Sequence, residues 1–128
     1  LGLPKVEFPV KFKLVCSVLL DALRDVSQIT DKVKLSALKE EFQIRGESEE
    51  GYETTVSLRY DSAEIIEKEV GNETSAVYNV ELLSGVVKEM SRISEIASLS
   101  FGTDLPLKLG FEFSDGSKFD FYLAPRIE

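Results

Sequence analysis

Apolar and polar residues alternate along most of this chain with a period of two, which is typical of strands. In FPVKFKL (8–14) every second residue is apolar, and two lysines stand between them. The same alternation recurs between turn residues, so it predicts further strands. They span residues 31–39, 41–46, 52–60, 64–70, 76–80, 95–101, 107–113 and 118–124.

Two segments, 15–29 and 80–93, repeat their apolar residues every three or four positions instead, which is typical of amphipathic helices. The first stripe contains Val15, Leu19, Ala22, Val26 and Ile29. The polar faces carry Ser17, Asp21, Arg24 and Gln28 in the first helix and Glu81, Ser84, Lys88 and Arg92 in the second.

The order of these elements repeats, because each helix follows a strand and precedes three strands. The separation of the two helices exceeds the roughly 20–50-residue periods of solenoids. We therefore expect one α+β domain with internal pseudo-symmetry, built of two strand–helix–three-strand units. Short turns predict antiparallel sheets that carry both helices on one side.

The last hairpin has two possible registers. A two-residue turn at Asp115-Gly116 would pair Phe113 with Lys118 and mix apolar and charged residues on one face. A three-residue loop over 115–117 would pair Phe113 with Phe119 and keep that face apolar, so we expect this register. The inward side chains would be Phe119, Phe121 and Leu123, and the outward ones Asp120 and Tyr122.

Composition narrows the function. The chain has 128 residues, of which 43% are hydrophobic and 30% charged, as in one ordinary globular domain. A net charge of −8 argues against tight binding of nucleic acid by phosphate neutralisation. No apolar run approaches the roughly 18–20 residues that span a bilayer, so no membrane partner is expected. The start at Leu1 rather than Met indicates a fragment or a processed product.

Histidine is absent and Cys16 is the single cysteine. Zinc sites of Cys and His, and nucleophiles activated by His, are therefore excluded, as is an internal disulfide. Neither glycine-rich phosphate-binding motif is present. An enzyme here would have to rely on carboxylates, lysine or tyrosine. We expect no cofactor and no metal; Cys16 lies on the apolar stripe and is expected in the core.

Four segments in order resemble one known family. They are LGLPKVEF (1–8), LRDVSQITDKVKLSA (23–37), FGTDLPLKLGFEF (101–113) and FYLAPRIE (121–128). Together with the doubled plan, they resemble the C-terminal half of the proliferating cell nuclear antigen type of DNA sliding clamp, found in archaea and eukaryotes. The compact ending and the Glu- and Lys-rich surface favour an archaeal source.

This resemblance implies that residues 1–8 end an interdomain connector and 9–128 form the C-terminal domain, without the N-terminal domain. It implies a DNA-clamp fold and a non-enzymatic processivity factor in DNA replication and repair. Three two-domain chains, identical or different, would form a trimeric ring around duplex DNA. DNA polymerase, flap endonuclease, DNA ligase and clamp loader would dock through peptides. The location implied is the cytoplasm near the nucleoid in archaea, or the nucleus in eukaryotes.

The resemblance also implies three surfaces. The partner-peptide groove would be lined by Leu1, Leu3, Phe8, Pro106, Tyr122, Ala124, Pro125 and Ile127. The DNA-facing cations would be Arg24, Lys88 and Arg92, with Lys13 near the rim. The subunit interface would be the edge strand bearing Tyr52, Thr54, Val56, Leu58 and Tyr60.

Two alternatives stay open beside the clamp. The first is a stand-alone protein-interaction module of the same fold that forms no ring. The second is a metal-dependent enzyme that uses the carboxylates of Asp21, Asp25 and Asp31, although helical geometry places Asp21 beside Arg24 on a solvated face. On the clamp interpretation, Glu81 is a departure, since arginine is common there in the family, and it makes the lining less basic.

Overall fold

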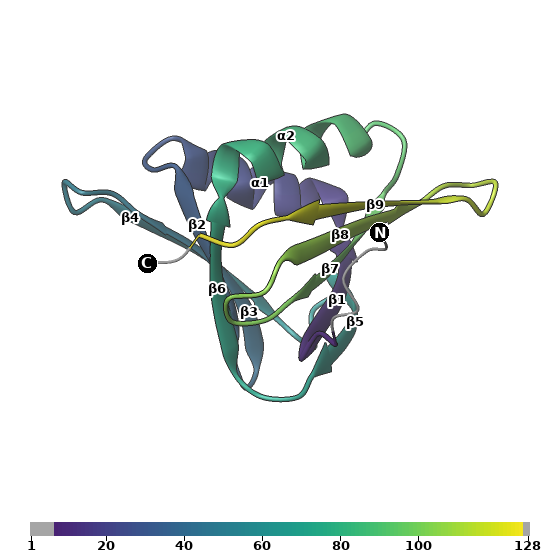
Figure 1. The fold of residues 1–128 in the computed structure, drawn as a ribbon, viewed down its shortest axis with the longest axis horizontal. Helices are drawn as coiled ribbons and strands as arrows, with labels where there is room; N and C mark the ends of the chain where they lie inside the picture. The colour runs from purple at the N-terminus through teal and green to yellow at the C-terminus, as the bar shows by residue number, and fades with distance from the viewer. Residues whose placement is uncertain (1–6, 127–128) are drawn as a thin grey trace.

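The computed structural model describes residues 7–126, and each predicted strand and helix is present there, with ends that differ by a few residues (Figure 1). The strands are β1 (Val10–Val15), β2 (Lys32–Ala37), β3 (Glu41–Glu47), β4 (Glu53–Arg59), β5 (Ile65–Val70), β6 (Thr74–Asn79), β7 (Ile96–Phe101), β8 (Leu107–Glu112) and β9 (Lys118–Leu123). The helices are α1 (Cys16–Ser27) and α2 (Val80–Met90).

The strands form two antiparallel sheets in which the two repeated units exchange their first strands. Sheet A has the order β5-β1-β7-β8-β9, and sheet B has the order β4-β3-β2-β6. Thus β1, from the first unit, pairs with β7 of the second, and β6 pairs with β2 of the first. Each sheet therefore contains strands from both units, so neither unit has a complete sheet alone.

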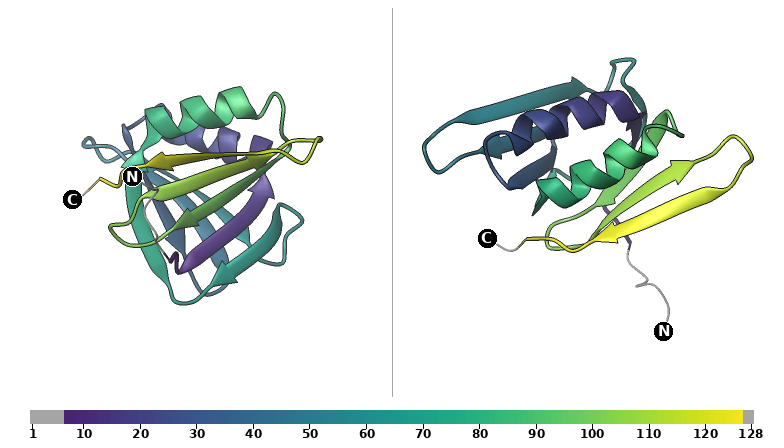
Figure 2. Two further views of the ribbon diagram at one scale, coloured as in Figure 1. Left: turned by 45° about the vertical axis from the view of Figure 1, so that its right-hand side comes forward. Right: turned by 90° about the horizontal axis from the view of Figure 1, so that it is seen from above.

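Both helices lie side by side on the same side of the sheets, as the view from above shows (Figure 2). The apolar stripe of α1, including Leu19, Leu23 and Val26, is fully buried, and Leu83 and Val87 of α2 are buried beside it. The α+β arrangement expected from the pattern, antiparallel sheets that carry both helices on one side, is thereby confirmed. No helix within residues 7–126 is long and apolar enough to cross a membrane.

Aromatic side chains join the two sheets at the centre of the core. The ring of Phe12 in β1 lies 4.6 Å from that of Phe42 in β3, and Phe101 in β7 lies 6.0 Å from Phe42, between ring centroids. Tyr60 stacks on Phe12 at 5.7 Å. Each such pair contributes about 0.5–1.5 kcal/mol beyond the burial of its area. These contacts hold the two sheets together where they meet.

The register expected for the last hairpin is wrong by two residues. Phe111, not Phe113, lies opposite Phe119. The three-residue loop is 114–116, because Gly116 has φ 87° and this loop type needs a left-handed residue in third place. A shift of two keeps the same residues inward, but Phe119 is 42% exposed because this hairpin projects from the body (Figure 1).

Gly46 marks a close approach of α1 to β3, which yields a test of the packing. A Cβ at Gly46 would lie 2.6 Å from Val26 Cγ1 and 3.1 Å from Thr30 Cγ2. Gly46→Ala is therefore expected to lower the free energy of unfolding by about 1–3 kcal/mol. Chemical denaturation measures the change.

Gly85 in α2 provides the matched control, since a Cβ there meets nothing within 4 Å. Gly85→Ala is expected to raise the free energy of unfolding by about 0.5–1 kcal/mol through helix propensity. Equal effects of the two substitutions would contradict the packing of α1 on β3.

Candidate functional site

The C-terminal segment and the loop before β8 meet at one end of the molecule. The pairs Val10 with Phe101 and Leu107 with Leu123 place the start of β1, the end of β7, the start of β8 and the end of β9 there. The chain after β9 then crosses to sheet B, where the Arg126 N–H donates to the Val77 carbonyl at 2.8 Å. This end therefore gathers segments that are far apart in sequence.

The described residues that are expected to line the partner-peptide groove lie at this same end, which we call the groove end. Phe8, Pro106, Tyr122 and Pro125 are half-buried, and Ala124 is exposed. Tyr122 lies opposite Lys108 on the outer face of sheet A, as the alternation predicts. The other three expected groove residues, Leu1, Leu3 and Ile127, lie outside the described residues.

Gly102 brings the beginning of β1 against the loop at residues 102–106. A Cβ at Gly102 would lie 2.8 Å from Pro9 Cδ and 2.7 Å from Leu105 Cδ1. Pro9 and Leu105 therefore both lie close to Gly102. Their neighbours Phe8 and Pro106 are brought to the same end of the molecule. A glycine at position 102 is what permits this close approach.

The exposed cations Arg24 of α1, Lys88 of α2 and Arg92 in the turn after α2 differ from those of sheet A in their partners. Lys13 on β1 lies 3.7 Å from Glu67, and Lys118 on β9 lies 3.5 Å from Glu112. Among residues 7–126, the structure gives Arg24, Lys88 and Arg92 no ion pair. These three side chains are consequently available to another anion.

Arg24 and the end of α2 lie close together, because Arg24 and Ser91 line one cavity of about 580 Å³. Lys13 is not part of this group. Its strand alternates with the buried Phe12 and Leu14, so Lys13 projects from the face of sheet A away from the core and the helices. The helices also expose carboxylates, namely those of Asp21, Asp25, Glu81 and Glu89.

Most of the side chains expected at the subunit interface point from the edge strand β4 into the domain. Leu58 is buried, Val56 and Tyr60 pack against the core, and Thr54 is half-buried. Tyr52, which precedes the strand, is 68% exposed. The side chains of β4 therefore mostly stabilise this domain, and its backbone is what the edge offers to a neighbour.

The alternation of hydrogen bonds along β4 shows which of its backbone groups have no partner in sheet B. Tyr60 donates its N–H to the Glu40 carbonyl at 3.1 Å, and Ser48 donates to the Tyr52 carbonyl at 2.8 Å. Since bonding alternates along an antiparallel pair, residues 52, 54, 56, 58 and 60 bond toward β3. The N–H and C=O groups of residues 53, 55, 57 and 59 point away from sheet B, and of these the Arg59 carbonyl already accepts from the Ser62 N–H at 3.0 Å.

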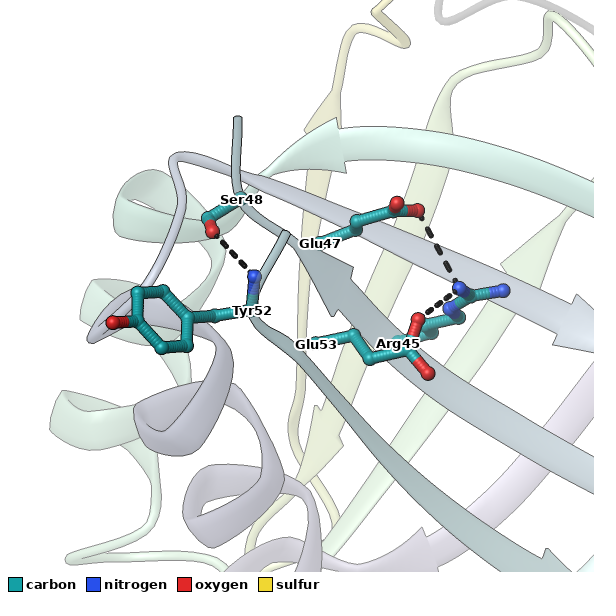
Figure 3. Close-up of polar contacts among 5 residues, drawn as sticks. All are labelled: Arg45, Glu47, Ser48, Tyr52 and Glu53. Atoms are coloured by element: carbon teal, nitrogen blue, oxygen red, sulfur yellow. Dashed lines mark hydrogen bonds and ion pairs between the residues drawn. The ribbon is translucent and has the colours of Figure 1, made fainter. Parts of the chain in front are cut away.

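The β3–β4 hairpin is fixed by polar contacts around its tip (Figure 3). The Arg45 guanidinium lies 2.6 Å from a Glu53 carboxylate oxygen and 3.4 Å from one of Glu47. The Tyr52 N–H donates to the Ser48 hydroxyl at 3.0 Å. These contacts hold the ring of Tyr52 out from the sheet, next to the start of the free edge.

The carboxylates and the cysteine within residues 7–126 form no metal-binding group. No group of three His, Cys, Asp or Glu side chains there could hold a metal ion. Asp31 forms an ion pair with Arg126 at 3.2 Å instead. Cys16 is buried as expected, and burial raises the pKa of its thiol to about 11.

Several contacts at the groove end involve residues that the sequence did not single out. The Tyr78 hydroxyl donates to the Leu105 carbonyl at 2.8 Å, and the Thr103 hydroxyl donates to the Ser75 carbonyl at 3.1 Å. Tyr78 alternates with other apolar residues in its strand, so its pattern indicated only a core position. Its partner is 27 residues away, and no local signal indicates it.

The arrangement of two antiparallel sheets with paired helices on one side defines the DNA-clamp class of fold. The crystal structure of PCNA from Thermococcus kodakaraensis has the same fold, with a TM-score of 0.90 at 20% sequence identity. The match covers 98% of this chain and 51% of that one.

Sequence comparison identifies the family within this class. The profile of the proliferating cell nuclear antigen C-terminal domain matches residues 2–126, so the chain belongs to this family. It is 34% identical over 128 residues to a DNA polymerase sliding clamp of Thermococcus gammatolerans, covering 100% of this chain and 51% of that protein. A DNA polymerase sliding clamp of Pyrococcus furiosus is 32% identical over 126 residues, covering 98% and 50%.

The chain thus spans about half the length of the curated relatives it matches. Sliding clamps of this family are processivity factors rather than enzymes, as the resemblance implied.

Burial of Cys16 yields a chemical test. A pKa of about 11, against the ordinary value of 9.0, makes the thiolate fraction at pH 8 about 100-fold smaller than in the unfolded chain. Iodoacetamide is therefore expected to alkylate the native protein at least about 100-fold more slowly than the denatured protein.

The same shift has a consequence for stability. As the pH rises from 9 to 11, the unfolded thiol ionises before the buried one, so stability is lost in that window. This part of the loss should be missing from Cys16→Ala. Native alkylation as fast as that of the denatured chain would contradict the burial.

Proposed function

We propose that this chain is the C-terminal half of a sliding-clamp subunit, with residues 1–8 ending an interdomain connector and 9–128 forming the domain. The full subunit would assemble into a trimeric ring around duplex DNA and tether replication and repair enzymes to it. The observation that carries this proposal is that one clamp domain fills the chain, whereas its relatives named DNA polymerase sliding clamp are about twice as long.

The helix layer would face the DNA. Arg24, Lys88 and Arg92 suit this role because they have no ion-pair partner among residues 7–126, and phosphates are strong anionic partners for such cations. Carboxylates on the same helices, together with the net charge of −8, keep the attraction weak. A ring retains DNA by its topology, so weak contact is compatible with sliding. Lys13 would lie away from this surface, toward the rim.

The free edge of β4 would pair with the neighbouring subunit, with Tyr52, Thr54, Val56, Leu58 and Tyr60 as the strand that carries the interface. An edge strand with unpaired N–H and C=O groups is a template for another strand. The groups available are the N–H and C=O groups of residues 53, 55 and 57 and the N–H of Arg59, since the Arg59 carbonyl accepts from the Ser62 N–H. Such pairing would extend sheet B across the subunit boundary.

The groove end would dock partner peptides. Tyr122 on the outer face, with Ala124, Pro125 and Pro106, leaves apolar surface outside the core, and Phe8 adds to it. Leu1, Leu3 and Ile127 complete the proposed lining. Peptides with aliphatic and aromatic anchors fit such a surface, and DNA polymerase, flap endonuclease, DNA ligase and clamp loader are the proposed sources.

Ring formation can be tested at Ser57. Ser57→Pro removes an N–H that points away from sheet B, so the domain is expected to fold while pairing across the edge is disturbed. The full-length polypeptide is the proposed subunit with its N-terminal domain included. In it we expect a discrete trimer for the unaltered protein and at least about tenfold weaker assembly for the variant. Sedimentation velocity at several concentrations measures both.

Ser57→Ala is the matched control, since it keeps the N–H and should assemble normally. A monomer in the unaltered full-length polypeptide would favour a stand-alone interaction module over a ring. A trimer unaffected by Ser57→Pro would place the interface elsewhere.

Peptide docking can be tested with the double substitution Tyr122→Ala and Pro125→Ala. Loss of two half-buried apolar side chains from the groove is expected to weaken binding at least about tenfold. Fluorescence anisotropy of a labelled synthetic peptide with leucine and phenylalanine anchors measures the affinity for the full-length polypeptide. Asp120→Ala on the same face of β9 is the control, and unchanged binding by the double variant would refute the groove assignment.

A further inference from the structure

Two segments from outside sheet B are hydrogen-bonded to its strand β6. It is an edge strand of sheet B, and two carbonyls on its open side accept hydrogen bonds from the sheet A end of the chain. The Ser75 carbonyl accepts from the Thr103 hydroxyl at 3.1 Å, and the Val77 carbonyl accepts from the Arg126 N–H at 2.8 Å. The loop at 102–106 and the segment at 124–126 are thus both attached to one strand.

Two side chains strengthen these attachments. Tyr78 of β6 has no exposed surface, and its hydroxyl donates to the carbonyl of Leu105, the residue before Pro106. Asp31, just before β2, forms an ion pair with the guanidinium of Arg126, the residue after Pro125. Each contact therefore holds a backbone position directly adjacent to a proposed groove proline.

We propose that the β6 edge positions the two walls of the peptide groove, with Tyr78 and Asp31 as positioning residues that do not themselves touch the peptide. This inference rests on the proposed docking function. Its physical basis is that a groove binds more tightly when its walls are ordered beforehand, because binding then costs less conformational entropy. A loop and a chain end are otherwise among the most mobile parts of a domain.

The two positioning residues differ in strength. Loss of the Tyr78 hydroxyl would leave the half-buried Leu105 carbonyl without this donor, which is costly. The Asp31–Arg126 pair is solvent-exposed on both sides, and exposed ion pairs contribute little. We therefore expect Tyr78 to control the loop wall strongly and Asp31 to control the terminal wall weakly.

The experiment compares Tyr78→Phe with Ser94→Ala in the full-length polypeptide. Ser94 is the control because its buried hydroxyl also donates to backbone carbonyls, those of Ile96 and Glu112 at 3.0 Å, but at the opposite end of sheet A from the groove. With the same leucine- and phenylalanine-anchored peptide, we expect about fivefold weaker binding for Tyr78→Phe and less than about twofold for Ser94→Ala. Thermal unfolding should occur at a lower temperature in both variants, since each loses the hydroxyl that donates to a backbone carbonyl.

A charge exchange tests Asp31 in the same assay. Asp31→Arg and Arg126→Asp should each weaken peptide binding about twofold or more, and the double variant should recover most of the loss. A purely structural role would lower the unfolding temperature of Tyr78→Phe and Ser94→Ala without a difference between their peptide affinities. Equal affinities for Tyr78→Phe and Ser94→Ala, or no recovery in the charge-exchanged double variant, would overturn the proposal.

Amide hydrogen exchange separates failure of this inference from failure of the docking function. Exchange at residues 102–105 and at Arg126 should be faster in Tyr78→Phe than in Ser94→Ala, whether or not a peptide binds. If the unaltered protein does not bind the peptide, the groove proposal fails. If exchange at these residues is the same in both variants, the positioning role of β6 fails even where the peptide binds.

Discussion

The exchange of first strands between the two sheets is the constraint on which the rest of this structure depends. Because β1 lies in sheet A and β6 lies in sheet B, each repeated unit is completed by a strand of the other. Phe12 and Phe101 of sheet A meet Phe42 of sheet B in the core, so the two sheets are also joined through side chains. The two repeated units therefore form one domain, and both helices lie on the same side of its sheets.

The two edges of sheet B differ in whether other parts of the chain cover them. The edge at β6 is covered by the loop at 102–106 and the segment ending at Arg126, which use its carbonyls. The edge at β4 keeps alternate backbone groups unpaired and carries the exposed Tyr52 at its start. An edge closed from within suits a rigid site for peptides, whereas an open edge suits assembly with another chain.

Charge is distributed in keeping with these roles. On sheet A, Lys13 and Lys118 are neutralised by neighbouring carboxylates, which leaves the outer face balanced. On the helix layer, Arg24, Lys88 and Arg92, the last in the turn after α2, have no such partner among residues 7–126. An acidic protein can thereby present cations on one chosen surface, because ion pairing, and not net charge, decides which charges remain available.

The sequence by itself determined the elements, their faces and the family. Period-two and helical patterns placed every strand and helix, because burial of one face imposes that periodicity, and four segments indicated the clamp resemblance. Only the tertiary structure decided which strands pair, the register beyond Phe113, and the contacts of Tyr78 and Asp31. Strand exchange and long-range hydrogen bonds leave no periodic trace, since a residue's pattern reports its own burial but not the identity of its distant partner.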